Sequence, residues 1–547
     1  MHKYRFLMLF LLLNVTFLFQ LSLSHTNTSS QNKCSNTSKL TFKKIVFHGS
    51  EPYERFGCAP SEVGDVNNDG YDDFVIGQIT DGIASLFFGR PSNQWKSNNS
   101  RADADVILKT NASACQPSSY RDDWCFTAPA IGGNFNGDSY DDFIIMNSGM
   151  HPYSKGGVMV FLGRSSEQWK ENSSALNVNT TFVGENDGDR AGHGATGVGD
   201  VNNDGFDDLV IGALNNDEGG DEAGQTYLIL GSSTFEWNGQ YSLSSLANAS
   251  FIGEASGDLS GIWVNKAGDV NKDGFDDFVI GAFEGQSTDT NRKVHLIFGR
   301  PTDQWYKDTP LSQANVTFIS EDRSRDVGLS WRWSSGAGDV NNDGFSDFIF
   351  GDYRNDKTYL ILGRPTEKWR TNYYFSESNS SFLGENGIIW SGFCVTGVGD
   401  TNMDGNDDFL IGAFASGGHL GKVYLILGRS SDRWTQNMPL DQSNASFIGE
   451  TESDWFGWDI SGAGDVDNNG LDDLLIGAPE NIFDSNRGKA YLFLSEITHT
   501  TSTPSIPNTS KRSSTSEQPT TRTNAISYFG VLIALSLPYL FTKRKNN

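Results

Sequence analysis

The chain has few cysteines, a minority of basic residues and no long amphipathic helical pattern, and each shortage excludes a class of protein. Its 547 residues include five cysteines, too few for a scaffold held together by disulfides. The 41 Lys and Arg residues are outnumbered by 68 Asp and Glu, so no basic face is available for nucleic acid. Between its two ends, no segment has the apolar spacing of an amphipathic helix. These shortages favour an all-β protein that binds no nucleic acid.

Catalytic signatures are also missing from the sequence. It contains no HExxH or GxSxG motif, and its eight histidines are scattered. We therefore expect a binding protein and no enzyme.

The two ends of the chain predict a secreted, membrane-anchored protein. Residues 1–24 have the basic start and apolar run of a signal peptide. Residues 525–541 are apolar and are followed by a basic tail at 542–547, which predicts a transmembrane helix of a single-pass type I protein in the plasma membrane. A removable lipid-anchor signal is the alternative. The Ser/Thr/Pro-rich residues 496–524 predict an extended stalk.

An acidic nine-residue segment of the type DVNNDGFDD recurs seven times, and its copies begin 61 to 70 residues apart. Every repeat also contains short β-branched or aromatic runs bounded by Gly, Asn and Asp, which are strand signals. The period predicts an all-β, seven-bladed β-propeller of four-stranded blades over residues 40–495. A strand from Phe42 to Gly49 precedes the first repeat, and the last repeat lacks its fourth strand. We expect this N-terminal strand to complete the seventh blade.

The acidic segments have the donor pattern of a calcium site. Positions 1, 3, 5 and 9 offer side-chain oxygens, position 7 offers its backbone carbonyl, and Gly at position 6 permits a sharp turn. Hard oxygen donors select Ca²⁺. The predicted ligands of six loops are Asp65, Asn67, Asp69, Tyr71 and Asp73; Asp200, Asn202, Asp204, Phe206 and Asp208; Asp269, Asn271, Asp273, Phe275 and Asp277; Asp339, Asn341, Asp343, Phe345 and Asp347; Asp400, Asn402, Asp404, Asn406 and Asp408; and Asp465, Asp467, Asn469, Leu471 and Asp473.

The second loop departs from this pattern. Its corresponding residues are Asn134, Asn136, Asp138, Tyr140 and Asp142. Asn134 replaces the first carboxylate, and Ser139 takes the place of the turn glycine. We therefore expect six calcium sites, and at the second loop weak binding or none.

The acidity of the chain is concentrated in these loops. Together they contain 26 Asp and one Lys, a net charge of -25, whereas the whole chain carries -27. The low isoelectric point therefore reports metal sites, and the additional Asp at position 8 of most loops is expected to face solvent.

The tryptophans fall into two groups. Six follow the third strand of a repeat at a fixed spacing and are interpreted as packing residues: Trp95, Trp169, Trp237, Trp305, Trp369 and Trp434. The others precede an acidic loop by 6 to 10 positions, at the opposite end of the first strand: Trp124, Trp263, Trp331, Trp333, Trp390, Trp455 and Trp458. These seven are candidates for ligand binding through cation-π or sugar stacking, and packing around nearby glycines is the alternative.

Sequons for N-glycosylation are dense outside the signal peptide, which supports secretion. Five of them precede the fourth strand of a repeat, where a glycan would shield a strand edge: Asn179, Asn248, Asn315, Asn379 and Asn444.

These motifs resemble the FG-GAP repeats of the integrin α-subunit propeller. Phe56–Gly57 and Phe456–Gly457 precede acidic loops, and IGAPE at residues 476–480 follows one. The resemblance implies a calcium-binding adhesion propeller with metal loops on one face and ligands on the other. Because the repeats lead directly to the stalk and a KRKNN ending without a GFFKR-like motif, we do not expect pairing with an integrin β subunit.

We therefore expect an adhesion or recognition receptor for an extracellular protein, matrix or glycan ligand. The alternative is a carbohydrate-binding lectin, because some secreted FG-GAP propellers resemble this chain and bind sugars.

Overall fold

The computed structural model describes most of the repeat region. The described residues are 36–52, 54–78, 82–109, 128–148, 155–171, 178–283, 291–321, 334–385, 389–479 and 487–501. Residues 38–499 form one compact unit; residues 1–37 and 500–547 form a second, described only at 36, 37, 500 and 501. The predicted signal peptide and membrane segment lie outside the described residues, among which no helix is long and apolar enough to span a membrane.

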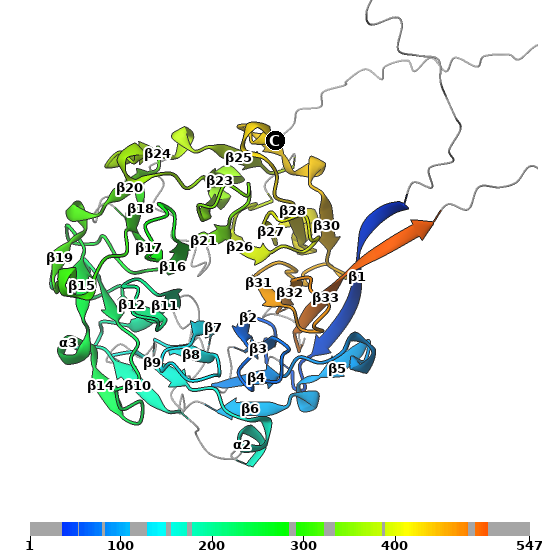
Figure 1. Ribbon diagram of the computed structural model, residues 1–547, viewed down its shortest axis with the longest axis horizontal. Coiled ribbons are helices and arrows are strands. Elements are labelled where there is room, and N and C mark those ends of the chain that lie inside the picture. The colour runs from blue at the N-terminus through cyan, green and yellow to red at the C-terminus, as the bar shows by residue number, and fades with distance from the viewer. Residues whose placement is uncertain are drawn as a thin grey trace, which may run out of the picture. The chain divides into compact units, whose positions relative to one another are not determined.

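The compact unit is an all-β propeller of seven sheets arranged radially round a central channel (Figure 1), as predicted. Four antiparallel strands build each blade, and the first lies nearest the channel. The inner strands are β2 (Ala59–Gly64), β7 (Ala128–Gly133), β11 (Ala191–Gly199), β16 (Val264–Gly268), β21 (Ser334–Gly338), β26 (Cys394–Gly399) and β31 (Ile460–Gly464). The second strands are β3 (Asp73–Gly77), β8 (Asp142–Asn147), β12 (Asp208–Ala213), β17 (Asp277–Phe283), β22 (Asp347–Asp352), β27 (Asp408–Ala413) and β32 (Asp473–Ala478).

The outer half of each blade follows the same order. The third strands are β4 (Ile83–Phe87), β9 (Gly157–Phe161), β13 (Gln225–Ile229), β18 (Arg292–Ile297), β23 (Lys357–Ile361), β28 (Lys422–Ile426) and β33 (Lys489–Thr501). The outer strands are β6 (Val106–Lys109), β10 (Thr180–Val183), β15 (Ala249–Ile252), β20 (Val316–Ile319), β25 (Ser380–Leu383), β30 (Ala445–Ile448) and β1 (Asn36–His48).

Short elements lie on the rim. Five short strands pair in parallel with an outer strand of the preceding blade, and we call them covering strands: β5 (Asn98–Ser100), β14 (Gln240–Ser242), β19 (Thr309–Pro310), β24 (Asn372–Tyr374) and β29 (Met438–Pro439). The helices are α2 (Ser166–Glu171), α3 (Leu243–Leu246), α4 (Ser416–His419) and the 3-10 turns η1 (Ser92–Gln94), η2 (Arg101–Asp103), η3 (Thr302–Gln304), η4 (Leu311–Gln313), η5 (Tyr353–Asn355), η6 (Thr366–Lys368), η7 (Phe375–Glu377), η8 (Ser431–Arg433) and η9 (Leu440–Gln442).

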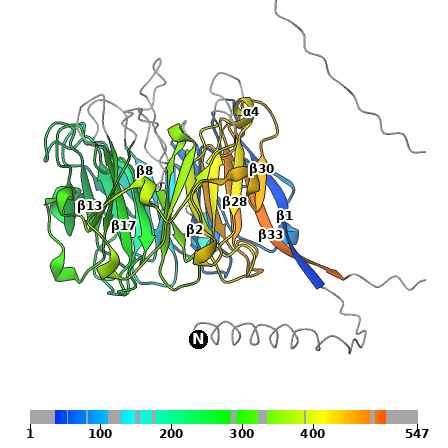
Figure 2. The same ribbon diagram turned by 90° about the horizontal axis from the view of Figure 1, so that it is seen from above.

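The N-terminal strand closes the ring. The seventh sheet has the order β31-β32-β33-β1, so strand β1 is the fourth strand of the last blade. Beyond the blade, β1 and β33 continue side by side (Figure 2), and the Thr41 hydroxyl donates to the Glu496 carbonyl at 3.2 Å. This confirms the prediction that the N-terminal strand completes blade seven.

The core lies between neighbouring blades, because the faces of adjacent sheets bury each other. Val75 of β3 and Phe143 of β8, for example, share one buried cluster. Of the six tryptophans predicted to pack, Trp369 is partly buried and the other five are buried.

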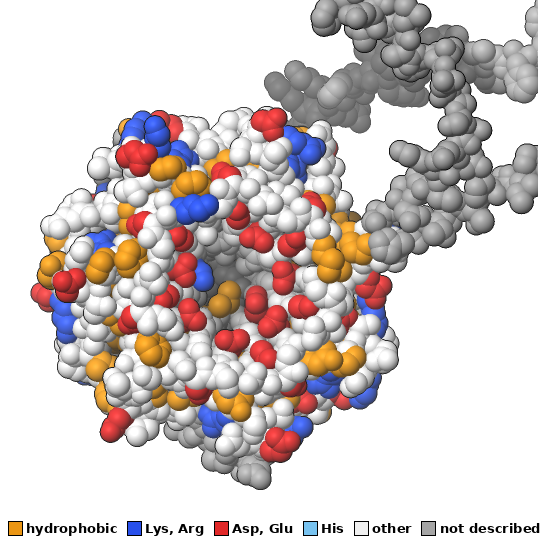
Figure 3. Space-filling model, viewed as in Figure 1, with side chains coloured by type: hydrophobic (Ala, Val, Ile, Leu, Met, Phe, Trp, Pro, Cys, Tyr) orange, Lys and Arg blue, Asp and Glu red, His pale blue; other side chains and the backbone are white. Residues whose placement is uncertain are grey.

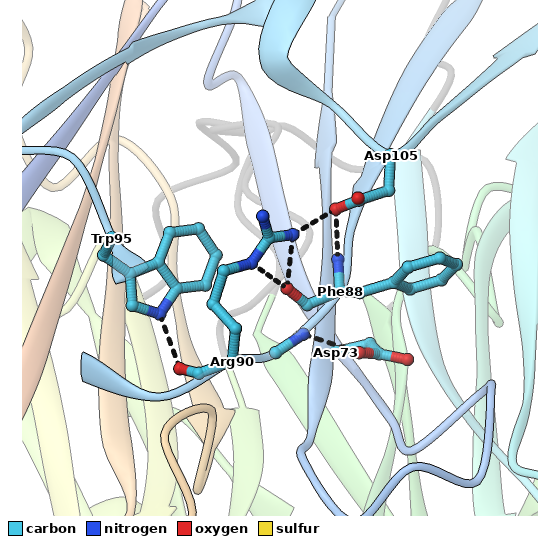
Figure 4. A network of polar contacts seen from close by, with 6 residues as sticks. Asp73, Phe88, Arg90, Trp95 and Asp105 are labelled. Carbon is cyan, nitrogen blue, oxygen red and sulfur yellow. Dashed lines mark hydrogen bonds and ion pairs between the residues drawn. The ribbon is translucent and has the colours of Figure 1, made fainter. Parts of the chain in front are cut away.

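A polar network fixes these tryptophans in place (Figure 4). In blade 1 the Arg90 guanidinium lies 4.6 Å from the Trp95 ring centre and pairs with Asp105. The Trp95 indole donates to the Arg90 carbonyl at 3.1 Å. In blades 2, 4, 5 and 6 a sequon asparagine occupies the position of Asp105 beside an equivalent arginine. The network therefore explains why this spacing of Arg, Trp and Asn recurs.

Candidate metal and ligand sites

Each acidic loop joins an inner strand to the second strand of the same blade, and six of the seven loops share one backbone path. In the first loop, Asn68 at position 4 and Gly70 at position 6 have φ of 53° and 88°. This path points the amides of Asp69 and Gly70 at the Asp65 carboxylate, at 3.0 and 2.8 Å. The fixed carboxylate leaves further lone pairs toward the loop centre.

The last aspartate of each loop begins the second strand and connects two turns. Both oxygens of Asp73 accept backbone amides, from Val66 at 3.1 Å and from Gly89 at 2.8 Å. The same pair of bonds recurs at Asp142, Asp208, Asp277, Asp347, Asp408 and Asp473. This aspartate therefore has a structural role in addition to the predicted one as a metal donor.

Several position-3 side chains present buried oxygens that accept no hydrogen bond. These are the side-chain oxygens Oδ1 of Asn67, Asn341 and Asp467. In the seventh loop, carboxylate oxygens of Asp465, Asp467 and Asp473 lie within 4.8 Å of one another. Because a buried oxygen without a partner costs free energy, a convergent set of them fits a hard cation.

Burial disfavours the ionised form of the last aspartate in the regular loops and also in the second loop, where it raises the pKa of Asp142 to about 8. Desolvation, followed by the nearby carboxylates at positions 5 and 1, raises the pKa of Asp208, Asp277 and Asp347 to about 8. In the seventh loop, desolvation and the carboxylates of Asp467 and Asp465 raise the pKa of Asp473 to about 9. A divalent cation would favour the ionised form of each group and offset this repulsion. The donor set therefore fits calcium.

The second loop is closed by its own hydrogen bonds. The Asn134 side chain accepts from the Gly137 amide at 2.7 Å and donates to the Asp138 carbonyl at 2.6 Å. Asn136 accepts from the Asp138 amide at 2.8 Å and donates to its carboxylate at 3.0 Å. Ser139 has no positive φ, so the second left-handed turn of the other loops is missing. The second loop therefore lacks both the first carboxylate and the second left-handed turn of the other loops.

The aspartates at position 8 do not face solvent as the sequence suggested. Each accepts the position-1 amide of the preceding blade: Asp72 from Asp465, Asp141 from Asp65, Asp207 from Asn134, Asp276 from Asp200, Asp407 from Asp339 and Asp472 from Asp400. Burial raises the pKa of Asp472 to about 6. In the fifth loop this position is Ser346, whose amide donates to the Asp269 carbonyl at 3.1 Å. Hydrogen bonds therefore link the loops of neighbouring blades, and sequence spacing within one repeat could not show this.

The loops lie at one end of the inner strands, so they surround the channel on one face. Figure 3 shows Asp and Glu side chains gathered round the channel mouth on the face in view. The starts of the inner strands lie at the opposite face, together with the described tryptophans that precede them, Trp263, Trp390, Trp455 and Trp458.

An aromatic cluster on that opposite face spans blades 5, 6 and 7. It consists of Tyr353, Trp390, Phe393, Phe414, His419, Trp455 and Trp458. The Trp455 and Trp458 rings stack with centres 4.9 Å apart, and the Phe414 ring lies 4.8 Å from that of Trp458. Trp390, Trp455 and Trp458 pack against the hydrophobic core and are half-buried, so part of each side chain remains exposed to solvent.

Two tryptophans of the cluster have an unusual backbone. Trp390 and Trp455 have φ of 52° and 54°, in the left-handed region that bulky residues rarely adopt. Such strained residues concentrate at functional sites. The predictions named Trp390, Trp455 and Trp458 but missed Phe393 and Phe414. Phe393 precedes its acidic loop by the same spacing as Trp458 and was missed because only tryptophans were considered, whereas Phe414 follows its loop.

The remaining candidate tryptophans do not join this cluster. Trp263 is 5% exposed, and its ring fills the space beside Gly281. Trp124, Trp331 and Trp333 lie outside the described residues.

Comparison with known proteins gives the same picture as the fold. The model of the FG-GAP repeat matches residues 194–229 and 456–493. The chain is 29% identical to integrin alpha-8 of Gallus gallus over 182 residues, which are 31% of this chain and 16% of that protein. It is 28% identical to integrin alpha pat-2 of Caenorhabditis elegans over 225 residues, or 39% of this chain and 17% of the relative. Integrin alpha-PS2 of Drosophila melanogaster is 26% identical over 280 residues, or 50% and 18%.

The matched segments thus span less than a fifth of each of these three relatives. They cover up to half of this chain. The chain is an integrin-α-like β-propeller that carries FG-GAP repeats.

Proposed function

We propose that this propeller is the recognition unit of a calcium-stabilised cell-surface adhesion receptor, anchored as a single-pass type I membrane protein. It binds an extracellular protein or matrix ligand on the face opposite the acidic loops. The observation that carries the proposal is the half-buried aromatic cluster on that face, in a propeller whose reported relatives are integrin α subunits.

Calcium has a structural role in this proposal. Six loops hold the ion through the oxygens at positions 1, 3, 5, 7 and 9, and the second loop holds none. When bound, the ion supplies positive charge that keeps the buried carboxylates ionised. The hydrogen bonds from position 8 connect each loop to the preceding blade, so ordering one loop also orders its neighbour.

The ligand contacts the exposed parts of Trp390, Trp455 and Trp458. Aromatic faces attract Lys and Arg side chains, so a basic segment of a protein ligand suits this surface. A carbohydrate ligand would use the same faces, but the reported integrin relatives favour adhesion through protein or matrix.

Cell adhesion tests the proposal. Cells that display the chain should attach to a panel of matrix proteins or partner cells, and attachment should fall on chelation of calcium. The Trp455→Ala variant should lose most attachment, whereas Tyr306→Ala, which removes an aromatic ring that is 66% exposed elsewhere, should retain it. Failure to attach to any surface, or equal loss in both variants, would contradict the proposal. Binding on a glycan array with no protein ligand would favour the lectin.

A further inference from the structure

Most outer strands of the propeller are protected by a covering strand from the next blade. The pairs are β10 with β14, β15 with β19, β20 with β24, β25 with β29 and, across the closure, β1 with β5. Outward-facing amides donate to these segments: Ser250 to the Tyr306 carbonyl at 3.3 Å and Thr317 to the Thr371 carbonyl at 2.7 Å. In these blades the edge is therefore closed.

Blade 6 lacks this protection within the described residues, as does blade 1, for which the corresponding segment of blade 2 is described only in part. Strand β30 is the last strand of a four-stranded sheet, and the Ser446 amide, equivalent to that of Ser250, has no acceptor in the described part of the chain. The cause is the ring closure. A covering strand comes from between the third and outer strands of the next blade, and in blade 7 those two strands, β33 and β1, belong to opposite ends of the chain.

Exposure of the side chains agrees with an open edge. All four residues of β30 are half-buried or exposed, and Ile448 is 57% exposed. By contrast, three of the four residues of the covered strands β15 and β25 are buried. The contacts that β30 makes with β1, through the Phe42 and Phe447 rings and the Lys44–Glu450 ion pair, leave Ser446 and Ile448 exposed.

A glycosylation sequon lies directly at this edge. Asn444 precedes β30, is exposed, and is followed by Ala445 and Ser446. Its side-chain oxygen accepts from the Leu427 amide at 3.0 Å and from the Arg429 guanidinium at 3.1 Å. These two bonds hold the amide through its oxygen, whereas a glycan is attached to its nitrogen.

We propose that an N-linked glycan on Asn444 shields the open edge of β30 in place of a covering strand. Unpaired strand edges associate with other chains unless they are blocked, and a glycan is bulky and strongly hydrated. The proposal goes beyond the adhesion function and shares with it only the extracellular location. It predicts that loss of the glycan at Asn444 exposes a strand edge, whereas loss of a glycan at Asn379 does not, because Asn379 lies beside β25, which β29 already covers.

Another blade shows which residue can replace Asn444 without loss of its hydrogen bonds. In blade 1, Asp105 occupies the position of Asn444, accepts from the Phe88 amide at 2.9 Å and pairs with Arg90. Asn444→Asp should therefore preserve both hydrogen bonds. Ser446→Ala removes the sequon while leaving Asn444 unchanged, and Ser446→Thr retains the sequon. Asn379→Asp is the matched control on a covered edge.

The experiment uses the full chain produced in glycosylating eukaryotic cells and purified in detergent. Mass spectrometry of glycopeptides should find Asn444 occupied. Light scattering should show self-association at least tenfold stronger for Asn444→Asp and Ser446→Ala than for the native chain, Ser446→Thr and Asn379→Asp. An unmodified Asn444, unchanged association of both unglycosylated variants, or equal association of Asn379→Asp would overturn the proposal. If other sequons are occupied and Asn444 is not, only this inference fails; a chain without any glycan also contradicts the extracellular location.

Discussion

The first and second acidic loops have the same length and the same place in neighbouring blades, yet they satisfy their polar groups differently. In the first loop both polar atoms of the buried Asn67 side chain lack a hydrogen-bond partner. In the second, the side chains of Asn134 and Asn136 are each bonded within the loop. In the regular third loop, Asn202 bonds to Asp204 as Asn136 does to Asp138, so the clearest difference of the second loop is its first residue, where Asn134 replaces an aspartate.

Removal of calcium should have the largest effect, because it affects every regular loop at once. With a dissociation constant of ~0.1 mM and a tenfold higher free calcium concentration, each site contributes about 1.4 kcal/mol. Six additive sites contribute roughly 8 kcal/mol, comparable with the stability of a whole domain. Scanning calorimetry should show a fall in melting temperature of roughly 8 °C on chelation. An unchanged melting temperature would mean that the loops need no metal.

Substitution of the last loop aspartate should separate its structural role from its metal role. Asp208→Ala and Asp142→Ala each remove two backbone hydrogen bonds, which should cost about 2–6 kcal/mol in either loop. Only Asp208→Ala should cost about 1.4 kcal/mol more with calcium than without it. Denaturant unfolding of both variants, with calcium and with chelator, measures this difference. Equal calcium dependence in the two variants would show that the second loop also binds.

The interblade hydrogen bonds should make a smaller, calcium-independent contribution. Position 8 is an aspartate, Asp407, in the sixth loop and a serine, Ser346, in the fifth. The Asp407→Ser variant gives the sixth loop the serine of the fifth. It removes the bond of 2.7 Å from the Asp339 amide, and should cost about 1 kcal/mol. Ser346→Asp is the reciprocal variant and should not destabilise the fold. Chemical denaturation of both variants gives the comparison, and a large loss for Ser346→Asp would contradict this role for position 8.

The pH dependence should distinguish the calcium-free from the calcium-bound protein. Without calcium, burial raises the pKa of Asp208 to about 8, above its usual unfolded value of ~3.9, so its protonated form favours the fold and stability falls as pH rises between these values. Calcium binding requires the ionised form. The gain in melting temperature on adding calcium should therefore grow from pH 5 to pH 8, and calcium uptake near pH 7 should release protons. A gain independent of pH would show that these aspartates do not bind the ion.

The repeat period allowed the fold to be predicted almost completely. Seven copies of one strand pattern gave the blade number, and the unmatched Phe42 to Gly49 strand identified the closing strand. The donor positions of the loops stay a prediction, which rests on the local geometry of side chains within one nine-residue segment.

Contacts between repeats were less accessible to sequence reasoning. The partner of Asp72 is Asp465, almost 400 residues away, and their contact depends on closure of the ring. The aromatic cluster likewise joins Tyr353 to Trp390 and Trp455 to His419 across turns of different blades. Trp263 has a similar position before its loop but is buried against Gly281. Spacing within one repeat cannot distinguish these environments.

Calcium stoichiometry tests the central claim most directly. Equilibrium dialysis followed by elemental analysis should find six ions per native chain and five for Asp200→Asn. The triple variant Asn134→Asp, Gly137→Asn, Ser139→Gly gives the second loop the regular pattern and should bind seven. A native chain that binds no calcium, or one that binds seven ions with no increase in the triple variant, would contradict the account.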